Sequence, residues 1–342
     1  LSLAKLARLR RFILVGGSVQ AGVIIAAVTL VLLVFGVAWR VGVFTGFLVV
    51  LSSTAIVLKL FQERSQTDTP AGQASLALLI FQDLAMVIMV LLVPMLSAGE
   101  RGTFVDLLLV LGKAGLVIAL VLVLARRAIP WLLEQVAQTR REELFLLTIV
   151  TVCFGTAWVT NLFGVSLALG AFLAGLVVSE SRYSEQALSE ILPLRTVFNA
   201  VFFVSVGMLL DLRFVVAEPL LVLGAAVFTI AVKFASTTGA VLALGYPVRV
   251  AAAAGLTLAQ IGEFSFVLER SGQAAGLSPA GMAGAGDQVF IAATVLLMIL
   301  TPVFVQAGPR LGTALAPLAR TPLGRKTRKA GRGKTDRVGQ PV

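Results

Sequence analysis

Long apolar stretches alternate with short polar or charged stretches along most of the chain. A helix needs about 20 mostly apolar residues to cross the hydrocarbon core of a membrane. The stretches that are long enough, or nearly so, lie at 12–37, 41–61, 70–96, 104–128, 142–159, 163–179, 196–212, 217–244, 248–270 and 285–307. The pattern predicts an all-α polytopic membrane protein with about ten transmembrane helices.

Composition agrees with this prediction. The 342 residues are 58% hydrophobic and only 13% charged, whereas soluble domains carry about 25% charged residues. We expect a transmembrane domain over 1–308 and a basic, disordered cytoplasmic tail over 309–342. The tail suits anionic lipid, and because it has no aromatic side chains to stack on bases, nucleic acid is not an expected partner.

The basic residues also predict an orientation. If residues 1–11 are cytoplasmic, most of the 28 Lys and Arg residues fall on the cytoplasmic side, as the positive-inside rule requires. Both ends of the chain are then cytoplasmic, and the expected location is the plasma membrane. Because the chain starts at Leu1 with a basic amphipathic stretch and no signal-peptide pattern, we interpret it as lacking its N-terminal part.

One carboxylate stands where an apolar helix is predicted. Asp83, in LALLIFQDLAMVIMV, is the only charge between residues 70 and 96. A charge near the bilayer centre costs at least about 2.5 kcal/mol, and such residues usually mark ion pathways. We expect Asp83 to face a protein cavity and to serve in transport. The structural alternative is a buried ion pair with Lys233.

Three further polar features interrupt apolar stretches. They are Ser52, Ser53 and Thr54 in LVVLSSTAIVL, Lys233 in VFTIAVKFASTT, and Glu263 in LAQIGEFSFVL. Two stretches, 41–61 and 249–270, are short and contain Gly and small polar residues, which is typical of the discontinuous helices of inverted-repeat transporters. The second of these stretches comes seven helices after the first, and this odd offset gives the two opposite orientations. We expect them to cross near Asp83.

The polar residues of the predicted helices also have interpretations other than transport. Ser and Thr in membrane helices usually bond to their own helix or to a neighbour, and Asp287 lies near a helix end and is assigned no role. The chain has no histidine and a single cysteine, Cys153, so a disulfide and a cysteine metal site are excluded, and no cofactor is predicted. An intramembrane aspartyl protease would need two deep aspartates.

Four ordered motifs resemble a known family. LSSTAIVLKLFQER, LLIFQDLAMV, LGAFLAGLVVSES with ILPLRTVFNAVFFVSVGMLLD, and AQIGEFSFVL are similar to the monovalent cation:proton antiporter-2 family, Kef-type members above all, within the sodium/hydrogen exchanger superfamily. The resemblance implies inverted repeats with two crossed broken helices, a core and a dimerisation domain, a homodimer, and about three helices before this start. It places the cation- and proton-binding aspartate at Asp83, and basic and acidic residues of the crossing at Lys233 and Glu263. Gln82 falls where relatives carry a second aspartate or an asparagine.

The expected function is secondary transport and not enzyme catalysis. Asp83 would bind either a proton or a transported alkali cation and expose it to each side in turn, and the expected cation is K⁺ in preference to Na⁺. Gln82 and the oxygens of Ser53, Thr54 and the unwound backbone would complete the site. Because Lys233 would repel a cation, we expect it to pair with Glu263. The alternative is a gated potassium efflux channel, although no TVGYG-like filter is present.

Overall fold

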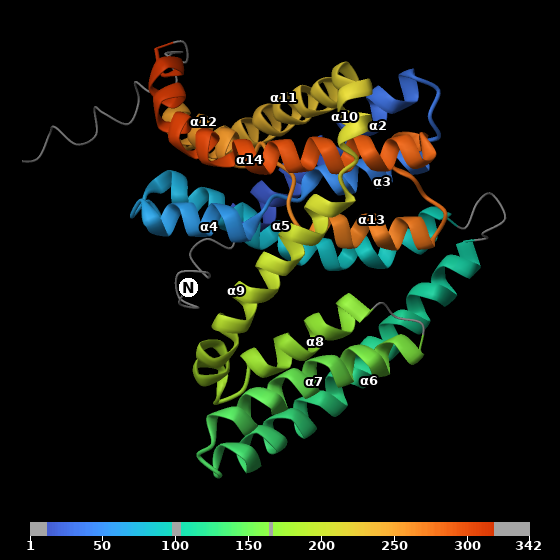
Figure 1. The fold of residues 1–342 in the computed structure, drawn as a ribbon, viewed down its shortest axis with the longest axis vertical. Helices are drawn as coiled ribbons and strands as arrows, with labels where there is room; N and C mark the ends of the chain where they lie inside the picture. Colours follow the sequence, from blue (N-terminus) through green and yellow to red (C-terminus); the bar gives the residue numbers. More distant parts are fainter. Residues whose placement is uncertain (1–11, 98–103, 164–166, 318–342) are drawn as a thin grey trace, which may run out of the picture.

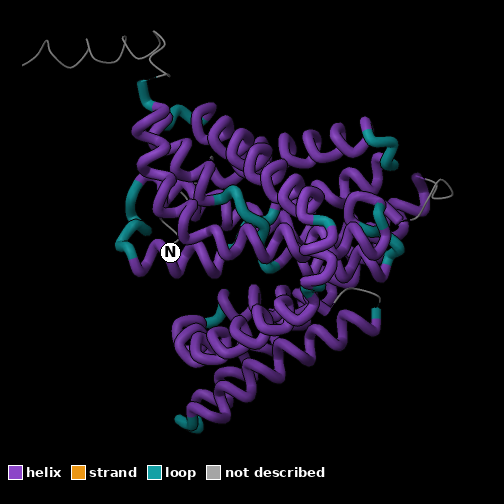
Figure 2. Tube along the Cα trace, turned by 45° about the horizontal axis from the view of Figure 1, so that its top comes forward, coloured by secondary structure: helices purple, strands orange, loops and turns teal. Residues whose placement is uncertain are grey.

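The computed structural model describes residues 12–97, 104–163 and 167–317, and throughout these ranges the ordered elements are helices (Figures 1 and 2). A short helical turn, η1 (Phe12–Gly16), opens the described chain, and another, η3 (Pro279–Gly281), precedes the last helix. The helices are α2 (Gly17–Val34), α3 (Trp39–Val50), α4 (Thr54–Glu63), α5 (Pro70–Ser97), α6 (Phe104–Ala137), α7 (Glu142–Leu162), α8 (Leu167–Ser179), α9 (Ser184–Leu209), α10 (Leu212–Ala217), α11 (Pro219–Ala243), α12 (Val248–Thr257), α13 (Phe264–Ala274) and α14 (Ala283–Leu315).

Every predicted apolar stretch contains helix, and the all-α prediction is confirmed. Seven spans in the described residues are long and apolar enough to cross a membrane, counting α3 and α4 as one. The predicted interruptions are real, because α3 and α4 are separated at 51–53 and α12 and α13 at 258–263. Both breaks lie inside the stretches that were expected to be discontinuous.

The predicted boundaries differ most from the observed ones at the start of α9 and the end of α6. Helix α9 begins at Ser184 and not at 196, and α6 continues to Ala137, well past 128. In both cases the missed part is amphipathic, and its apolar side packs inside the molecule, as Ala187 and Leu133 show. Hydropathy averaged over a window loses such segments because their polar side cancels the apolar one.

The expected tail lies mostly outside the described residues. Helix α14 continues to Leu315, so the first part of 309–342 is helical. Residues 318–342, like the basic start over 1–11, lie beyond the described ranges.

The helices form two groups with separate apolar cores (Figures 1 and 2). The larger group contains α2 to α5 and α11 to α14, with a core that includes Ile24, Leu48, Val93 and Leu297. The smaller group contains α6, α7, α8 and the first half of α9. Helix α9 belongs to both, because Ala187 packs in the smaller core and Val206 in the larger one.

Candidate functional site

The two breaks touch each other through their backbones. The amide of Gly262, in the second break, donates a hydrogen bond to the carbonyl of Leu51, in the first, over 3.0 Å. A Cβ atom at position 262 would lie 2.5 Å from the carbonyl carbon of Ser52, so only glycine fits. This close approach is the predicted crossing of the broken helices.

Unwinding a helix leaves backbone groups without partners, and glutamine side chains bond two of them here. The Ser52 amide donates to Oε1 of Gln82 over 2.8 Å, and the Ser53 amide donates to Oε1 of Gln260 over 3.0 Å. The Ser53 hydroxyl in turn accepts from the amide of Ile56, which caps the start of α4. The first break is therefore held in a single conformation by side chains from α5 and from the second break.

Lys233 caps the C-terminal end of α3. Its ammonium donates to the carbonyls of Val50 and Leu51 at 3.1 and 3.0 Å and to the hydroxyl of Ser52 at 2.9 Å, and its side chain is fully buried. A helix carries partial negative charge at its C-terminus, which a cation offsets. The expected pair with Glu263 is not formed among the described residues, and the Lys233 ammonium bonds to these three oxygens instead.

Glu263 instead lies at the start of α4. Its Oε1 accepts a hydrogen bond of 3.4 Å from the amide of Ala55, in the first turn of that helix. Its Oε2 is buried and has no hydrogen-bond partner among the described residues. A carboxylate at a helix N-terminus is favoured by the unpaired amides and by the helix dipole. The glutamate of the second break thus caps the half-helix that follows the first.

Asp83 lies at this same end of α4. The hydroxyl of Thr54 donates to the carboxylate, 3.1 Å from both Oδ1 and Oδ2, and the Asp83 side chain is half-buried. Glu263 and Arg195 of α9 both interact with it electrostatically. The carboxylate therefore faces protein groups, with Thr54 as its hydrogen-bond donor.

The position of Arg195 inside a helix was not predicted. Arg195 comes just before the predicted stretch 196–212 and so lay outside every predicted helix, whereas in the structure it lies within α9 and interacts electrostatically with Asp83. The sequence offered little signal for it, since a loop arginine and an arginine in an amphipathic helix look alike.

A chain of buried amides was also missed. The Gln82 amide nitrogen donates to Oε1 of Gln20 on α2 over 3.0 Å, and the Gln20 amide nitrogen donates to the hydroxyl of Thr237 on α11 over 2.7 Å. Gln20, Gln82 and Thr237 are all fully buried. The available signal was Gln20 itself, a polar amide inside an apolar stretch. Both ends of the Gln82 amide are thus engaged, and its role as an ion ligand stays a prediction.

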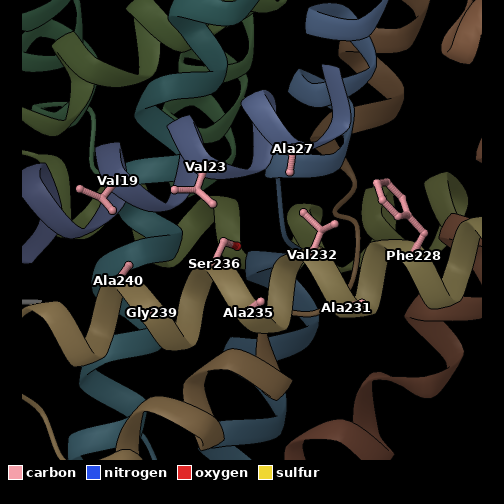
Figure 3. Close-up of a pocket in the computed structure, with 10 residues that line it drawn as sticks. All are labelled: Val19, Val23, Ala27, Phe228, Ala231, Val232, Ala235, Ser236, Gly239 and Ala240. Atoms are coloured by element: carbon pink, nitrogen blue, oxygen red, sulfur yellow. The ribbon is translucent and has the colours of Figure 1, made fainter. Parts of the chain in front are cut away.

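A groove of about 530 Å³ opens between α2 and α11 (Figure 3). Val19, Val23 and Ala27 line one wall, and small or apolar residues of α11 line the other, with Ser236 the sole polar side chain among them. Because its lining carries no charge, this groove offers nothing to neutralise a cation. Asp83, Lys233 and Glu263 lie at the helix breaks instead.

Carboxylate and hydroxyl oxygens are the ligands that hard alkali cations prefer. Asp83, the Thr54 hydroxyl and the free Oε2 of Glu263 supply that donor set around the N-terminus of α4. The same carboxylate can carry a proton instead of a metal cation. The arrangement therefore suits a site that exchanges the two.

Comparison with solved structures finds the same fold. The sodium/proton antiporter MjNhaP1 of Methanocaldococcus jannaschii superimposes with a TM-score of 0.62, covering 92% of this chain and 81% of that one, at 13% sequence identity. At this identity the similarity speaks for the fold and not for the substrate.

Sequence relatives are closer. The putative cation/proton antiporter YbaL of Escherichia coli strain K12 is 36% identical over 278 residues, which is 79% of this chain and 49% of that protein. The K(+) efflux antiporter 6 of Arabidopsis thaliana is 34% identical over 273 residues, 78% of this chain and 45% of that one. The chain spans about half the length of these relatives.

The match to a protein family covers nearly the whole chain. Residues 1–318 match the family described as "Sodium/hydrogen exchanger, transmembrane". That range contains both helix breaks and the side chains around them. The chain belongs to the sodium/hydrogen exchanger family.

Proposed function

We propose that this protein is a monovalent cation:proton antiporter in which Asp83 binds a proton and a cation alternately. The observation that carries the proposal is the state of its carboxylate, which is half-buried and bonded by a neutral hydroxyl, Thr54. A carboxylate locked in an ion pair could not take up a cation. The Asp83 carboxylate is bonded by a neutral group, so its negative charge can attract a cation.

Competition at one site couples the two ions. A proton on Asp83 removes the negative charge that the cation needs, and a bound cation opposes protonation. Glu263 contributes a second negative charge and a free oxygen beside the site. Thr54 contributes its hydroxyl oxygen, and Ser53 stands next to it as the N-cap of α4. Lys233 is tied to the end of α3 and plays no part in binding the transported ion.

Potassium is the proposed cation, in preference to sodium. The support is the names of the relatives, one of which is a K(+) efflux antiporter at 34% identity. The proposed cycle is alternating access, in which the site at the α4 end opens to one side of the membrane and then to the other. The support for it is the crossing of the two broken helices, beside which Asp83, Thr54 and Glu263 lie.

The proposed setting is the plasma membrane, with both ends of this chain in the cytoplasm. In Figure 1 the connections α4–α5, α6–α7, α8–α9 and α11–α12 lie on one side of the molecule. Arg64, Arg140, Arg141 and Arg182 belong to three of them, which supports the cytoplasmic assignment of that side. We also propose a homodimer, as the resemblance to the family implies.

The proposal is tested by proton flux in proteoliposomes that contain the full-length protein. An imposed K⁺ or Na⁺ gradient should drive proton movement, reported by a pH-sensitive dye inside the vesicles. Asp83→Asn should abolish that flux, because an amide neither takes up the proton nor supplies an anionic ligand. The matched control is Glu218→Gln, which neutralises an exposed acid between α10 and α11.

Two outcomes would contradict the proposal. Full exchange by Asp83→Asn would remove Asp83 from the mechanism. Potassium flux that proceeds without any proton flux would instead indicate a channel. Comparing K⁺ with Na⁺ as the driving ion identifies the substrate in the same experiment.

A further inference from the structure

A line of hydrogen bonds links the first helix break to α2 and α11. The Ser52 amide donates to Oε1 of Gln82 on α5 over 2.8 Å. Nε2 of Gln82 donates to Oε1 of Gln20 on α2 over 3.0 Å, and Nε2 of Gln20 donates to the hydroxyl of Thr237 on α11 over 2.7 Å. All four residues are at most 1% exposed. Gln20 is the link that joins the Gln82 amide to α11.

These hydrogen bonds can run in only one direction. A backbone N–H can only donate, so the atom of Gln82 that faces Ser52 has to be its oxygen. The nitrogen of the same amide then points away from the break and needs an acceptor, which Oε1 of Gln20 provides. A Gln82 amide turned over would place two donors against each other at Ser52. Gln20 therefore favours the orientation of Gln82 that the break requires.

Burial makes this contribution of Gln20 matter. In a buried polar network a missing partner costs more than at the surface, because the local dielectric constant is low and bulk water does not replace it. Without the Gln20 oxygen, Nε2 of Gln82 loses its acceptor. Rotating the Gln82 side chain to find another one would take its oxygen away from the Ser52 amide.

A second connection from α11 reaches the same serine. Lys233 and Thr237 lie four residues apart on α11, and therefore on one face of that helix. The Lys233 ammonium donates directly to the Ser52 hydroxyl over 2.9 Å. Thr237 holds the Ser52 amide through Gln20 and Gln82. Both polar groups of Ser52 are thus tied to α11, one directly and the other by way of α2 and α5.

The bond between Ser52 and Gln82 also bears on the candidate ion site. Gln82 directly precedes Asp83 on α5, and Ser52 comes two residues before Thr54. The Thr54 hydroxyl donates to the Asp83 carboxylate over 3.1 Å. The two segments that carry the hydroxyl and the carboxylate are therefore joined next to the site by one hydrogen bond, whose acceptor is oriented by Gln20.

We propose that Gln20 is a positioning residue for cation exchange. It fixes the orientation of the Gln82 amide, and through Gln82 it keeps the Thr54 hydroxyl and the Asp83 carboxylate at the spacing that binds the cation. This inference rests on the proposed function of Asp83. It assigns to α2 a role in the affinity of a site that lies between α4 and α5.

The first test is potassium-driven proton flux in proteoliposomes that contain the full-length protein. Gln20→Met replaces the amide by an apolar side chain of similar length. The K⁺ concentration for half-maximal flux should rise roughly three- to tenfold, the effect of losing about one buried hydrogen bond. The matched control is Ile24→Ala, fully buried one turn further along α2. It should lower the unfolding temperature and leave the half-maximal K⁺ concentration at the wild-type value. A Gln20→Met variant that behaves in the same way has a structural role only, and this overturns the proposal.

A double mutant tests whether Gln20 acts through Gln82. Adding Gln20→Met to Gln82→Met should raise the half-maximal K⁺ concentration no further than Gln82→Met alone, because the Gln20 oxygen then has no amide to orient. Effects that multiply would overturn the proposal. Thr237→Val keeps the shape of its side chain but removes the last acceptor, and it should act in the same direction as Gln20→Met and more weakly. If Gln20→Met does not fold, a wild-type half-maximal concentration in Thr237→Val overturns the proposal instead.

Hydrogen exchange at the first break provides a readout that needs no transport. In Gln20→Met the Ser52 amide should exchange roughly three- to tenfold faster than in the wild type, measured on peptides that cover residues 51–54. Peptides from α7, in the smaller helical group, serve as the reference within each variant. An unchanged rate at Ser52 relative to α7 overturns the proposal. If the wild type shows no cation-driven proton flux, the proposed function is wrong, and this measurement still decides whether Gln20 fixes the break.

Discussion

Lys233 and Asp83 are both charges in the middle of apolar helices, yet the protein treats them in opposite ways. The Lys233 ammonium is fully buried and donates to three oxygens at the end of α3. The Asp83 carboxylate is half-buried at the start of α4 and is bonded by Thr54. Three residues of unwound chain separate these two helix ends. One charge holds the break together, and the other stays available for a ligand.

The largest expected effect is on stability, from replacing Lys233. Lys233→Met leaves the Val50 carbonyl and the Ser52 hydroxyl oxygen without their donor, each worth about 1–3 kcal/mol, while the Leu51 carbonyl keeps its bond from Gly262. Part of this loss is offset because a buried charge is removed, so we expect a net destabilisation of about 2–4 kcal/mol. Lys233→Gln, whose amide can still donate, should be milder and retain some exchange. Complete loss of exchange in Lys233→Gln with unchanged thermal stability would show that Lys233 carries protons instead.

Gly262→Ala should come next, with an effect on both fold and flux. A methyl group there meets the backbone of Ser52 at 2.5 Å, and the two breaks must separate to admit it. We expect a cost of about 1–3 kcal/mol, together with loss of exchange. The control is Gly224→Ala on α11, where the added methyl meets nothing within 4 Å. Equal behaviour of the two variants in unfolding and flux assays would show that the close approach is unimportant.

A smaller effect is expected at the Asp83 side of the comparison. Thr54→Val keeps the shape of the side chain but removes the hydroxyl that bonds both carboxylate oxygens. A hydrogen bond to a charged group is worth about 1.5 kcal/mol or more, so the cation concentration for half-maximal flux should rise roughly tenfold. Thr54→Ser retains a hydroxyl and should stay near the wild type. If Val and Ser variants transport alike, the hydroxyl does not contribute to the site.

The smallest expected effect is that of membrane voltage. If Lys233 remains charged throughout the cycle and Gln82 cannot titrate, one proton exchanges for one monovalent cation. A potential acts only on net charge moved, at about 2.3 kcal/mol per 100 mV. The ion gradient at which proton flux reverses should therefore be the same with and without a clamped potential. A reversal point that shifts with voltage would point to Lys233 as a second proton carrier.

The sequence was informative wherever a residue conflicted with its surroundings. Asp83, Lys233 and the Gly and Ser residues of 41–61 and 249–270 stand out because each is costly in an apolar helix. The places of the two breaks followed from them. Such costs show that a compensating group exists, but they do not say which one.

Partners depend on three-dimensional detail that a pattern does not contain. The bond from Lys233 to backbone carbonyls was missed because every residue has a carbonyl, and only the path of the chain decides which carbonyls lose their helical partner. Glu263 was expected beside Lys233 for the same reason and instead caps α4. The start of α9 and the position of Arg195 were hidden by an amphipathic segment whose average hydropathy is low.

The bond between Gly262 and Leu51 has a mechanical consequence. An unwound stretch inside a helix is a natural hinge, and this molecule contains two. Joined to each other, and braced by Lys233, Gln82 and Gln260, neither can rotate alone. The four half-helices are therefore expected to move together as one rigid unit. Large relative movements of helices are expected outside this unit. Helix α9 packs in both helical groups, so a movement of one group relative to the other would bend it.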